Sequence, residues 1–139
     1  MDDTRDHIIA VLVAELAGDA RVALAVLFGS WARGQARGDS DVDVAILPES
    51  GGVSRAEELA LAARLSIACG REVDLVRLDD ASTLLRWRVA REGQLVHASR
   101  PEAWLRYRVS AASEYGDFAE AIERPAELFR RRAAVGGAC

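Results

Sequence analysis

The sequence predicts a single α/β (α+β) domain, in which a small mixed β-sheet is flanked by helices and followed by a helical tail. Three observations predict this class. The 139 residues are enough for one ordinary domain. Helical and strand-like hydrophobic periodicities alternate along the chain. The part that follows Pro101 shows only helical spacing. We expect the helices to lie on one side of the sheet.

The strands are predicted from two different patterns. Residues 22–28 form a continuous apolar run, which is typical of a strand buried on both faces. Residues 41–47 alternate strictly, so that Asp41 and Asp43 share one face while the valines between and after them occupy the other. A third alternating segment covers 72–78, and a short edge strand follows the helix after it.

Helices are predicted where apolar residues recur three and four positions apart. The predicted segments are 4–17, 54–70, 82–93, 101–122 and a short final helix that begins at Pro125. The second of these has a capping box, because Ser54 precedes it and Glu57 follows three residues later. A further short helix is expected over 31–35.

The composition excludes several classes of enzyme. All 18 basic residues are arginine, and a P-loop, a protein kinase and a pyridoxal-phosphate enzyme each need a lysine. His7, His97, Cys69 and Cys139 are too few and too scattered for a zinc site. Two cysteines also make no disulfide framework, which indicates a reducing compartment.

Charge and hydropathy restrict the partners. The net charge of −4 disfavours nucleic acid as the main partner. No apolar run approaches the roughly 20 residues that span a bilayer. The first residues are acidic and polar, unlike a signal peptide. We therefore expect a cytoplasmic protein without direct contact to membranes or nucleic acid.

One segment carries the candidate chemistry. The strand that ends at Phe28 delivers Gly29 and Ser30 to the expected start of a short helix, where unpaired N–H groups and the helix dipole bind anions. Further along, Asp41 and Asp43 project from one strand face, about 7 Å apart at a rise of ~3.3 Å per residue. Such a pair can hold a hard cation such as Mg²⁺. A phosphate site beside it outlines a nucleotidyl-transfer site.

Further residues compete for places in this site. Asp74, on the third strand, is a candidate for a second metal or for accepting a proton, and Glu72 shares its face. Since no lysine is present, we expect an arginine at the triphosphate, with Arg33 ahead of Arg37. Plainer interpretations exist: the carboxylates form a solvated strand face, and Ser30 caps a helix.

These residues resemble a known signature. Gly29-Ser30, ten further residues and then Asp41-x-Asp43 are similar to the motif of the DNA polymerase beta-like nucleotidyltransferase superfamily. In so short a chain they resemble its minimal nucleotidyltransferase (MNT) domains. The later segments that match are Val73-Asp74-Leu75-Val76, Leu85-Arg86-Trp87-Arg88, Arg91-Glu92-Gly93 and Tyr115-Gly116-Asp117-Phe118. The resemblance covers about residues 8–132.

The resemblance implies a nucleotidyltransferase core over 1–100 and a helical extension over 101–135 packed on it. MNT domains commonly act as antitoxins of HEPN-domain ribonuclease toxins, transferring AMP from ATP to a toxin tyrosine with Mg²⁺. The family roles carry over as follows: metal binding and catalysis to Asp41, Asp43 and Asp74, and nucleotide binding to Gly29 and Ser30. Two alternatives stay open, namely transfer to a small molecule such as an aminoglycoside and a non-catalytic antitoxin that only binds its toxin.

Overall fold

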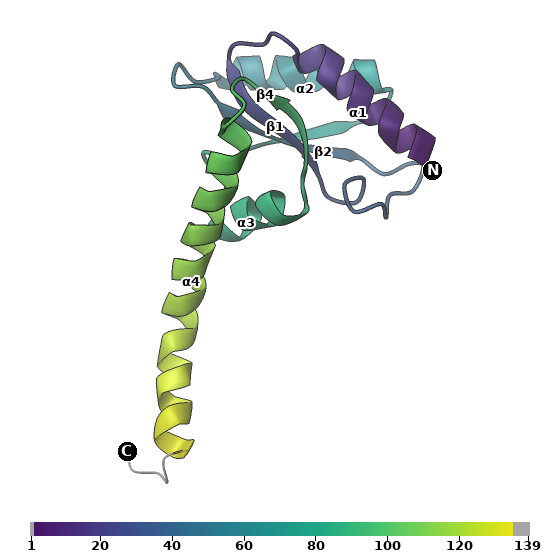
Figure 1. Cartoon of the computed structure of the whole chain (residues 1–139). Coiled ribbons are helices and arrows are strands. Elements are labelled where there is room, and N and C mark those ends of the chain that lie inside the picture. Colours follow the sequence, from purple (N-terminus) through teal and green to yellow (C-terminus); the bar gives the residue numbers. More distant parts are fainter. Residues whose placement is uncertain (1, 135–139) are drawn as a thin grey trace.

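A four-stranded mixed sheet forms the centre of the molecule (Figure 1). The structure, a computed structural model, describes residues 2–134, and side chains over residues 4–119. The strands, in the spatial order β3-β2-β1-β4, are β1 (Val22–Phe28), β2 (Val42–Pro48), β3 (Val73–Arg77) and β4 (Gln94–Ala98). Strand β1 pairs antiparallel with β2 and β4, whereas β2 and β3 run parallel. The predicted mixed sheet is confirmed.

Helices cover both faces of this sheet (Figure 1). They are α1 (Asp2–Leu16), α2 (Arg55–Cys69), α3 (Thr83–Glu92) and α4 (Ala103–Ala134). Residues of α1 and α2 pack with Leu27 of β1, whereas residues of α3 and α4 pack with Val26 on the opposite face. The expectation of helices on one side was therefore wrong. A central strand that is apolar on both faces has to be covered on both.

Helix α2 begins and ends as its sequence predicts. The Ser54 side chain accepts a hydrogen bond from the Glu57 N–H, and the Glu57 side chain accepts one from the Ser54 N–H, which completes the capping box. Gly70 ends the helix in the left-handed conformation, with φ of 66°. The Cys69 thiol is free and buried, and Cys139 lies outside the described residues.

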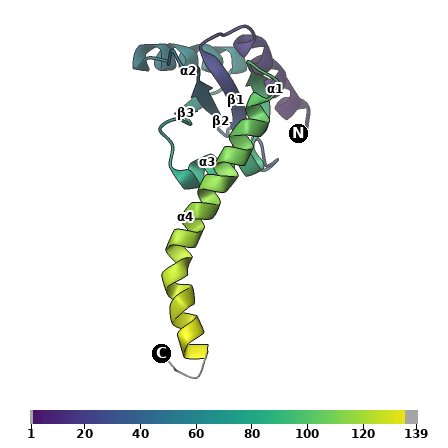
Figure 2. The ribbon, with the colours of Figure 1, turned by 60° about the vertical axis from the view of Figure 1, so that its left-hand side comes forward.

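Helix α4 leaves the core and projects from it over much of its length (Figures 1 and 2). It is one continuous helix of 32 residues, so the expectation of a new helix beginning at Pro125 was wrong. Alanine, glutamate and arginine on both sides of the proline favour helix and offset the one backbone hydrogen bond that proline removes. Among the described helices, α4 included, none combines the length and apolarity that a membrane span requires.

Candidate active site

Two aspartates from neighbouring strands lie side by side. The parallel register of β2 and β3 pairs Asp43 with Asp74. Parallel strands are about 4.8 Å apart, and paired residues point to the same face, so both carboxylates project from the α3 side of the sheet. Asp41 lies two residues before Asp43 and is exposed. The structure therefore gathers at one end of the sheet the three acids that the sequence singled out.

A glycine stands directly against this acidic end. Gly29 follows the last residue of β1, and Phe28 is the antiparallel partner of Asp43. The backbone of Gly29 has φ of +75°, and a Cβ added there would lie 2.3 Å from Oδ2 of Asp43. Both the conformation and the close approach require glycine. The Gly29 turn and the Asp43 carboxylate are thus in direct contact.

The surroundings of Asp43 disfavour the charged form of its carboxyl group. Partial burial, followed by the charges of Asp74 and Asp41, raises the pKa of Asp43 above its ordinary value, and the guanidinium of Arg33 opposes the rise. The carboxylates that act on Asp43 are the two predicted partners, Asp74 and Asp41. Glu72 is exposed at the position before β3. The site is a concentration of negative charge, which attracts cations.

The segment after Gly29 is a series of turns, so the expected helix over 31–35 was wrong. The Arg33 N–H donates to the Gly29 carbonyl at 3.1 Å, and the Gln35 N–H donates to the Ser30 carbonyl at 2.9 Å. Gly29 and Gly34 both have positive φ, which interrupts helical geometry. Anion binding here cannot rely on a helix dipole.

Backbone N–H groups remain available for an anion. Within residues 4–119, the backbone N–H groups of Ser30, Trp31 and Ala32 donate no hydrogen bond. Successive free N–H groups in a turn form an anion-binding concavity. The predicted anion site therefore has a physical basis in this turn, although a different one from the helix end that the sequence suggested.

Trp31 anchors this turn, and sequence reasoning missed its role. Its side chain is buried, and its indole N–H donates to the Ser40 carbonyl at 3.1 Å. Arg5 donates to the Trp31 carbonyl at 2.9 Å, and the Arg71 guanidinium lies 5.0 Å from the ring centroid. A lone aromatic residue in a polar loop was the available signal for Trp31. No local pattern marked Arg5 or Arg71.

The two candidate arginines have different surroundings. Arg33 pairs with Glu92 at the end of α3, at 3.4 Å, and its charge acts on Asp43. Arg37 is exposed, and its backbone N–H donates to the Ser40 hydroxyl at 2.8 Å. The structure therefore brings Arg33 toward the acidic end of the sheet. Glu92, which holds it, is a further residue that the sequence analysis did not identify as part of the site.

The donor set is suited to Mg²⁺ together with a nucleotide. Over the described residues, no group of three or more His, Cys, Asp or Glu side chains is placed to hold a metal ion. Mg²⁺ in phosphoryl-transfer sites takes only one or two carboxylates and completes its shell with water and substrate phosphates. Asp43, Asp74 and Asp41 provide such carboxylates, and the turn at Gly29 provides the phosphate donors. Such a site is suited to transfer at a phosphate of a bound nucleotide.

Known proteins are similar to this chain in sequence and in fold. The family model described as Polymerase beta, Nucleotidyltransferase matches residues 11–102. The chain is 33% identical over 97 residues to protein adenylyltransferase MntA of Shewanella oneidensis, covering 68% of this chain and 67% of MntA. A crystal structure of a toxin–antitoxin with AMP-PNP matches at a TM-score of 0.69 and 26% identity, covering 88% of this chain and 98% of that one.

A second solved structure extends the likeness further along this chain. Tri-AMPylated Shewanella oneidensis HEPN toxin in complex with MNT antitoxin matches at a TM-score of 0.60 and 25% identity, over 94% of this chain and 98% of the matched chain. The family match alone includes the Gly29 turn, β2 and β3, the three segments that carry the acids and the anion site. The chain belongs to the polymerase beta nucleotidyltransferase family.

Proposed function

We propose that this nucleotidyltransferase is a Mg²⁺-dependent protein adenylyltransferase that transfers AMP from ATP to a tyrosine hydroxyl of a HEPN-domain toxin, and so acts as its antitoxin. The observation that carries the proposal is the in-register pair Asp43–Asp74 against the Gly29 turn. The relatives support the choice of nucleotide and acceptor, since one is named a protein adenylyltransferase and others are complexes with AMP-PNP or with an AMPylated HEPN toxin.

Each residue has a proposed role. Asp41 and Asp43 hold Mg²⁺, which when bound neutralises triphosphate charge and orients the α-phosphate. The free N–H groups beginning at Ser30, with Gly29 permitting close approach, bind the β- and γ-phosphates. Arg33 exchanges its contact with Glu92 for a triphosphate oxygen.

Asp74 is the proposed general base, with the second-metal role as its alternative. Its carboxylate accepts the proton of the tyrosine hydroxyl while the phenolic oxygen forms a bond to the α-phosphorus. The bond from that phosphorus to the bridging oxygen of the β-phosphate breaks in line, and pyrophosphate leaves. The protein contributes position and charge, which carry most of the catalysis in phosphoryl and nucleotidyl transfer.

A labelling experiment tests the proposal. The chain is incubated with Mg²⁺, α-labelled ATP and HEPN-domain proteins, including any that is encoded next to its gene, and label is measured on the acceptor. We expect the wild-type chain to label a HEPN-domain protein and the double variant Asp41→Asn/Asp43→Asn to lose at least 1,000-fold of that activity, or ~4 kcal/mol of transition-state stabilisation.

Glu72→Gln is the control, since it removes a nearby carboxylate that is exposed before β3 and is not among those that act on Asp43, and we expect it to retain activity within a few fold. Undiminished labelling by the double variant would falsify the site assignment. Labelling of an aminoglycoside in place of any HEPN-domain protein would identify a small-molecule enzyme. Neutralisation of a toxin by the inactive double variant would indicate an antitoxin that acts by binding.

A further inference from the structure

A groove of about 390 Å³ runs between α3 and α4. We call it the α3–α4 groove. It is lined by Trp87 and Arg91 of α3 and by Leu105, Arg108, Val109 and Ala112 of α4. The groove is large enough to hold several water molecules. An apolar occupant would displace them at little cost if they are weakly ordered.

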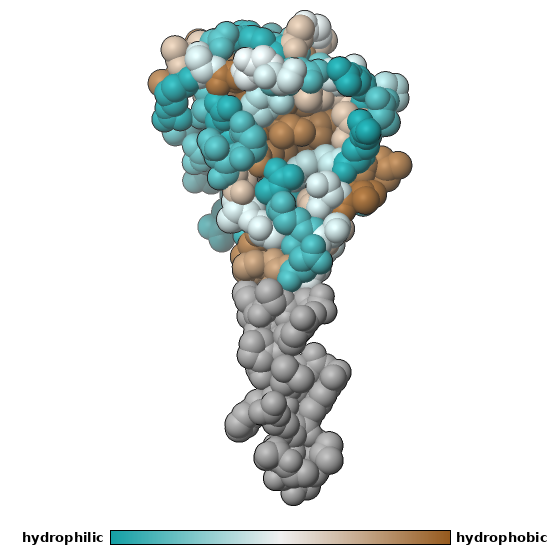
Figure 3. Space-filling model, turned by 90° about the vertical axis from the view of Figure 1, so that its left-hand side faces the viewer, coloured by the Kyte–Doolittle hydropathy of each residue, from teal (hydrophilic) through white to brown (hydrophobic). Residues whose placement is uncertain are grey.

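Helix α4 presents two apolar stripes, and only one of them is used by the core. Trp104, Tyr107 and Ala111 pack into the cluster on the α3 side of the sheet. Leu105 and Val109 are instead 64% and 61% exposed, and Ala112 continues their spacing of four and three residues. Figure 3 shows one face of the molecule, with apolar residues in separate patches, one of them next to the part of α4 drawn in grey. A second helical stripe without a covering element marks an interaction surface.

The charges around the groove favour an acidic partner. Arg91 and Arg108 line it, and no Asp or Glu does so among the described residues. Arg91 shares the single carboxylate of Glu92 with Arg33, at 3.2 and 3.4 Å, so the charge there stays positive. An isologous contact of two copies centred on the groove would place these arginines opposite their own counterparts, which costs energy.

The other side of the Leu105–Val109 stripe carries charges of both signs. A second hollow along α4 is bordered there by Arg106, Glu114 and Asp117, and Glu114 pairs with Arg86 of α3 at 3.2 Å. A partner helix lying over the stripe would therefore meet positive charge on the groove side, from Arg91 and Arg108, and side chains of both signs on the other. The groove side is therefore the one that favours acidic residues of the partner.

The end of α3 links the groove to the candidate active site. Arg91 borders the groove, and the next residue, Glu92, binds Arg33, whose charge acts on Asp43. The residue that follows α3 packs closely against β1, because a Cβ on Gly93 would lie 2.3 Å from Cγ1 of Val26. A protein segment bound in the groove would thus be held by rigid elements that lead to the reacting groups.

We propose that the α3–α4 groove docks an amphipathic helix of the acceptor protein, with acidic residues on the side that faces α3. This inference rests on the proposed function, and it names the surface by which the acceptor is recognised. A helix is the expected occupant because the Leu105–Val109–Ala112 spacing forms a ridge that a third helix can pack against. Docking there would hold the tyrosine-bearing part of the acceptor near Asp74 and raise its effective concentration.

The test compares two exposed apolar residues. Val109→Glu places a charge in the groove, whereas the control Ile67→Glu changes a residue that is 82% exposed on α2, across the sheet. Using the HEPN-domain protein that the wild-type chain labels, we expect Val109→Glu to raise the acceptor KM at least tenfold, with the ATP KM and the melting temperature unchanged. Ile67→Glu should leave all three quantities unchanged.

A charge reversal supplies the second variant. We expect Arg108→Glu to raise the acceptor KM and to weaken its dependence on salt. The groove proposal is wrong if the wild-type chain labels the acceptor and neither groove variant changes the acceptor KM. It is also wrong if Val109→Glu instead dissociates a self-dimer of the isolated chain in sedimentation. If the wild-type chain labels no HEPN-domain protein, the proposed function itself is wrong and the groove proposal falls with it.

Discussion

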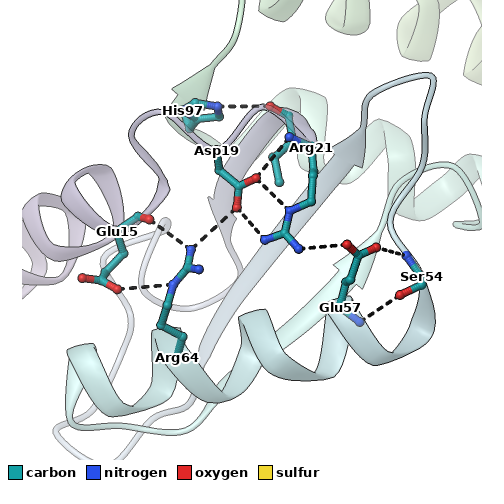
Figure 4. A network of polar contacts seen from close by, with 8 residues as sticks. Glu15, Asp19, Arg21, Ser54, Glu57, Arg64 and His97 are labelled. Carbon is teal, nitrogen blue, oxygen red and sulfur yellow. Dashed lines mark hydrogen bonds and ion pairs between the residues drawn. The ribbon is translucent and has the colours of Figure 1, made fainter.

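The two ends of β1 carry the same kinds of charged side chain in opposite environments. Before the strand begins, Asp19 accepts hydrogen bonds from the Arg21 guanidinium at 3.0 and 3.1 Å and pairs with Arg64 at 3.7 Å. Figure 4 shows this network continuing through Glu15 and Glu57. These partners, above all the Arg21 hydrogen bonds, lower the pKa of Asp19.

After β1 ends, the balance is reversed. Asp43 lies beside two other aspartates, and burial together with their charge raises its pKa. The cation that acts on it, Arg33, is shared with Glu92. One end of the sheet therefore neutralises its carboxylates with protein partners, while the other leaves them for a ligand. The difference is typical of a functional site, where stability is lower than the same residues could provide.

The largest expected effect, on AMP transfer, comes from filling the space between Gly29 and the Asp43 carboxylate. In Gly29→Ala the new Cβ would meet the Asp43 carboxylate and force it to move. We expect the rate of AMP transfer to fall at least 100-fold, equivalent to ~2.7 kcal/mol, and unfolding free energy to fall by about 1–2 kcal/mol from the positive φ. Transfer is measured with α-labelled ATP, and stability by thermal or urea unfolding.

Gly18→Ala is the matched control at the opposite end. Gly18 has φ of +76°, almost the value at Gly29, but nothing lies within 4 Å of a Cβ placed there. It should show the same loss of stability and no loss of activity. Equal losses of activity in both variants would contradict the steric role of Gly29.

A smaller effect, on stability alone, is expected from a substitution at Asp19, where the carboxylate is neutralised by arginines. Asp19→Ala leaves Arg21 and Arg64 without their shared acceptor. Because the Asp19 side chain is only 9% exposed whereas both arginines reach solvent, we expect a loss of about 2 kcal/mol of unfolding free energy. The Asp19 contribution is present above the ordinary pKa of 3.8 and is lost as pH falls through the lowered folded value. Urea unfolding at pH 7 and pH 3 measures it, and a penalty that persists undiminished in acid would contradict the ionic role.

Most of the sheet and part of the site could be predicted from local patterns. The alternation over β2 placed Asp43 and Asp41 on one face, and the similar pattern over β3 supplied Asp74. Their cross-strand pairing requires a parallel register that no local pattern encodes, yet the structure has it. The capping box at Ser54 was predictable because its partners are three residues apart.

What could not be predicted depends on contacts between distant residues. The turn after Gly29 is held by Trp31, Arg5 and Arg71, which come from three separate segments. Two glycines with positive φ prevented the expected helix, and glycine φ follows from the surroundings as much as from the sequence. The Arg33–Glu92 contact joins residues 59 positions apart, beyond the reach of any periodicity.

The smallest expected effect is a gain of stability at the Asp43 end of the sheet, whereas the Asp19 end shows a loss. Asp43→Asn removes a charge that its neighbours oppose, so we expect it to abolish transfer and yet to raise unfolding free energy, by up to about 1 kcal/mol, the range for like charges on adjacent strands. The pKa of Asp43 in the folded protein lies above its value in the unfolded chain. The wild-type carboxyl group therefore stabilises the folded state only in acid, and this contribution is lost as pH rises through the folded pKa. The stability advantage of the asparagine variant should therefore be absent near pH 3 and grow toward neutrality, opposite to the Asp19 contribution, which stabilises the wild type at neutral pH. Urea unfolding over pH 3–8 without divalent cations measures the difference, and an asparagine variant less stable than the wild type at pH 7 would show that the acidic end is neutralised as fully as the other.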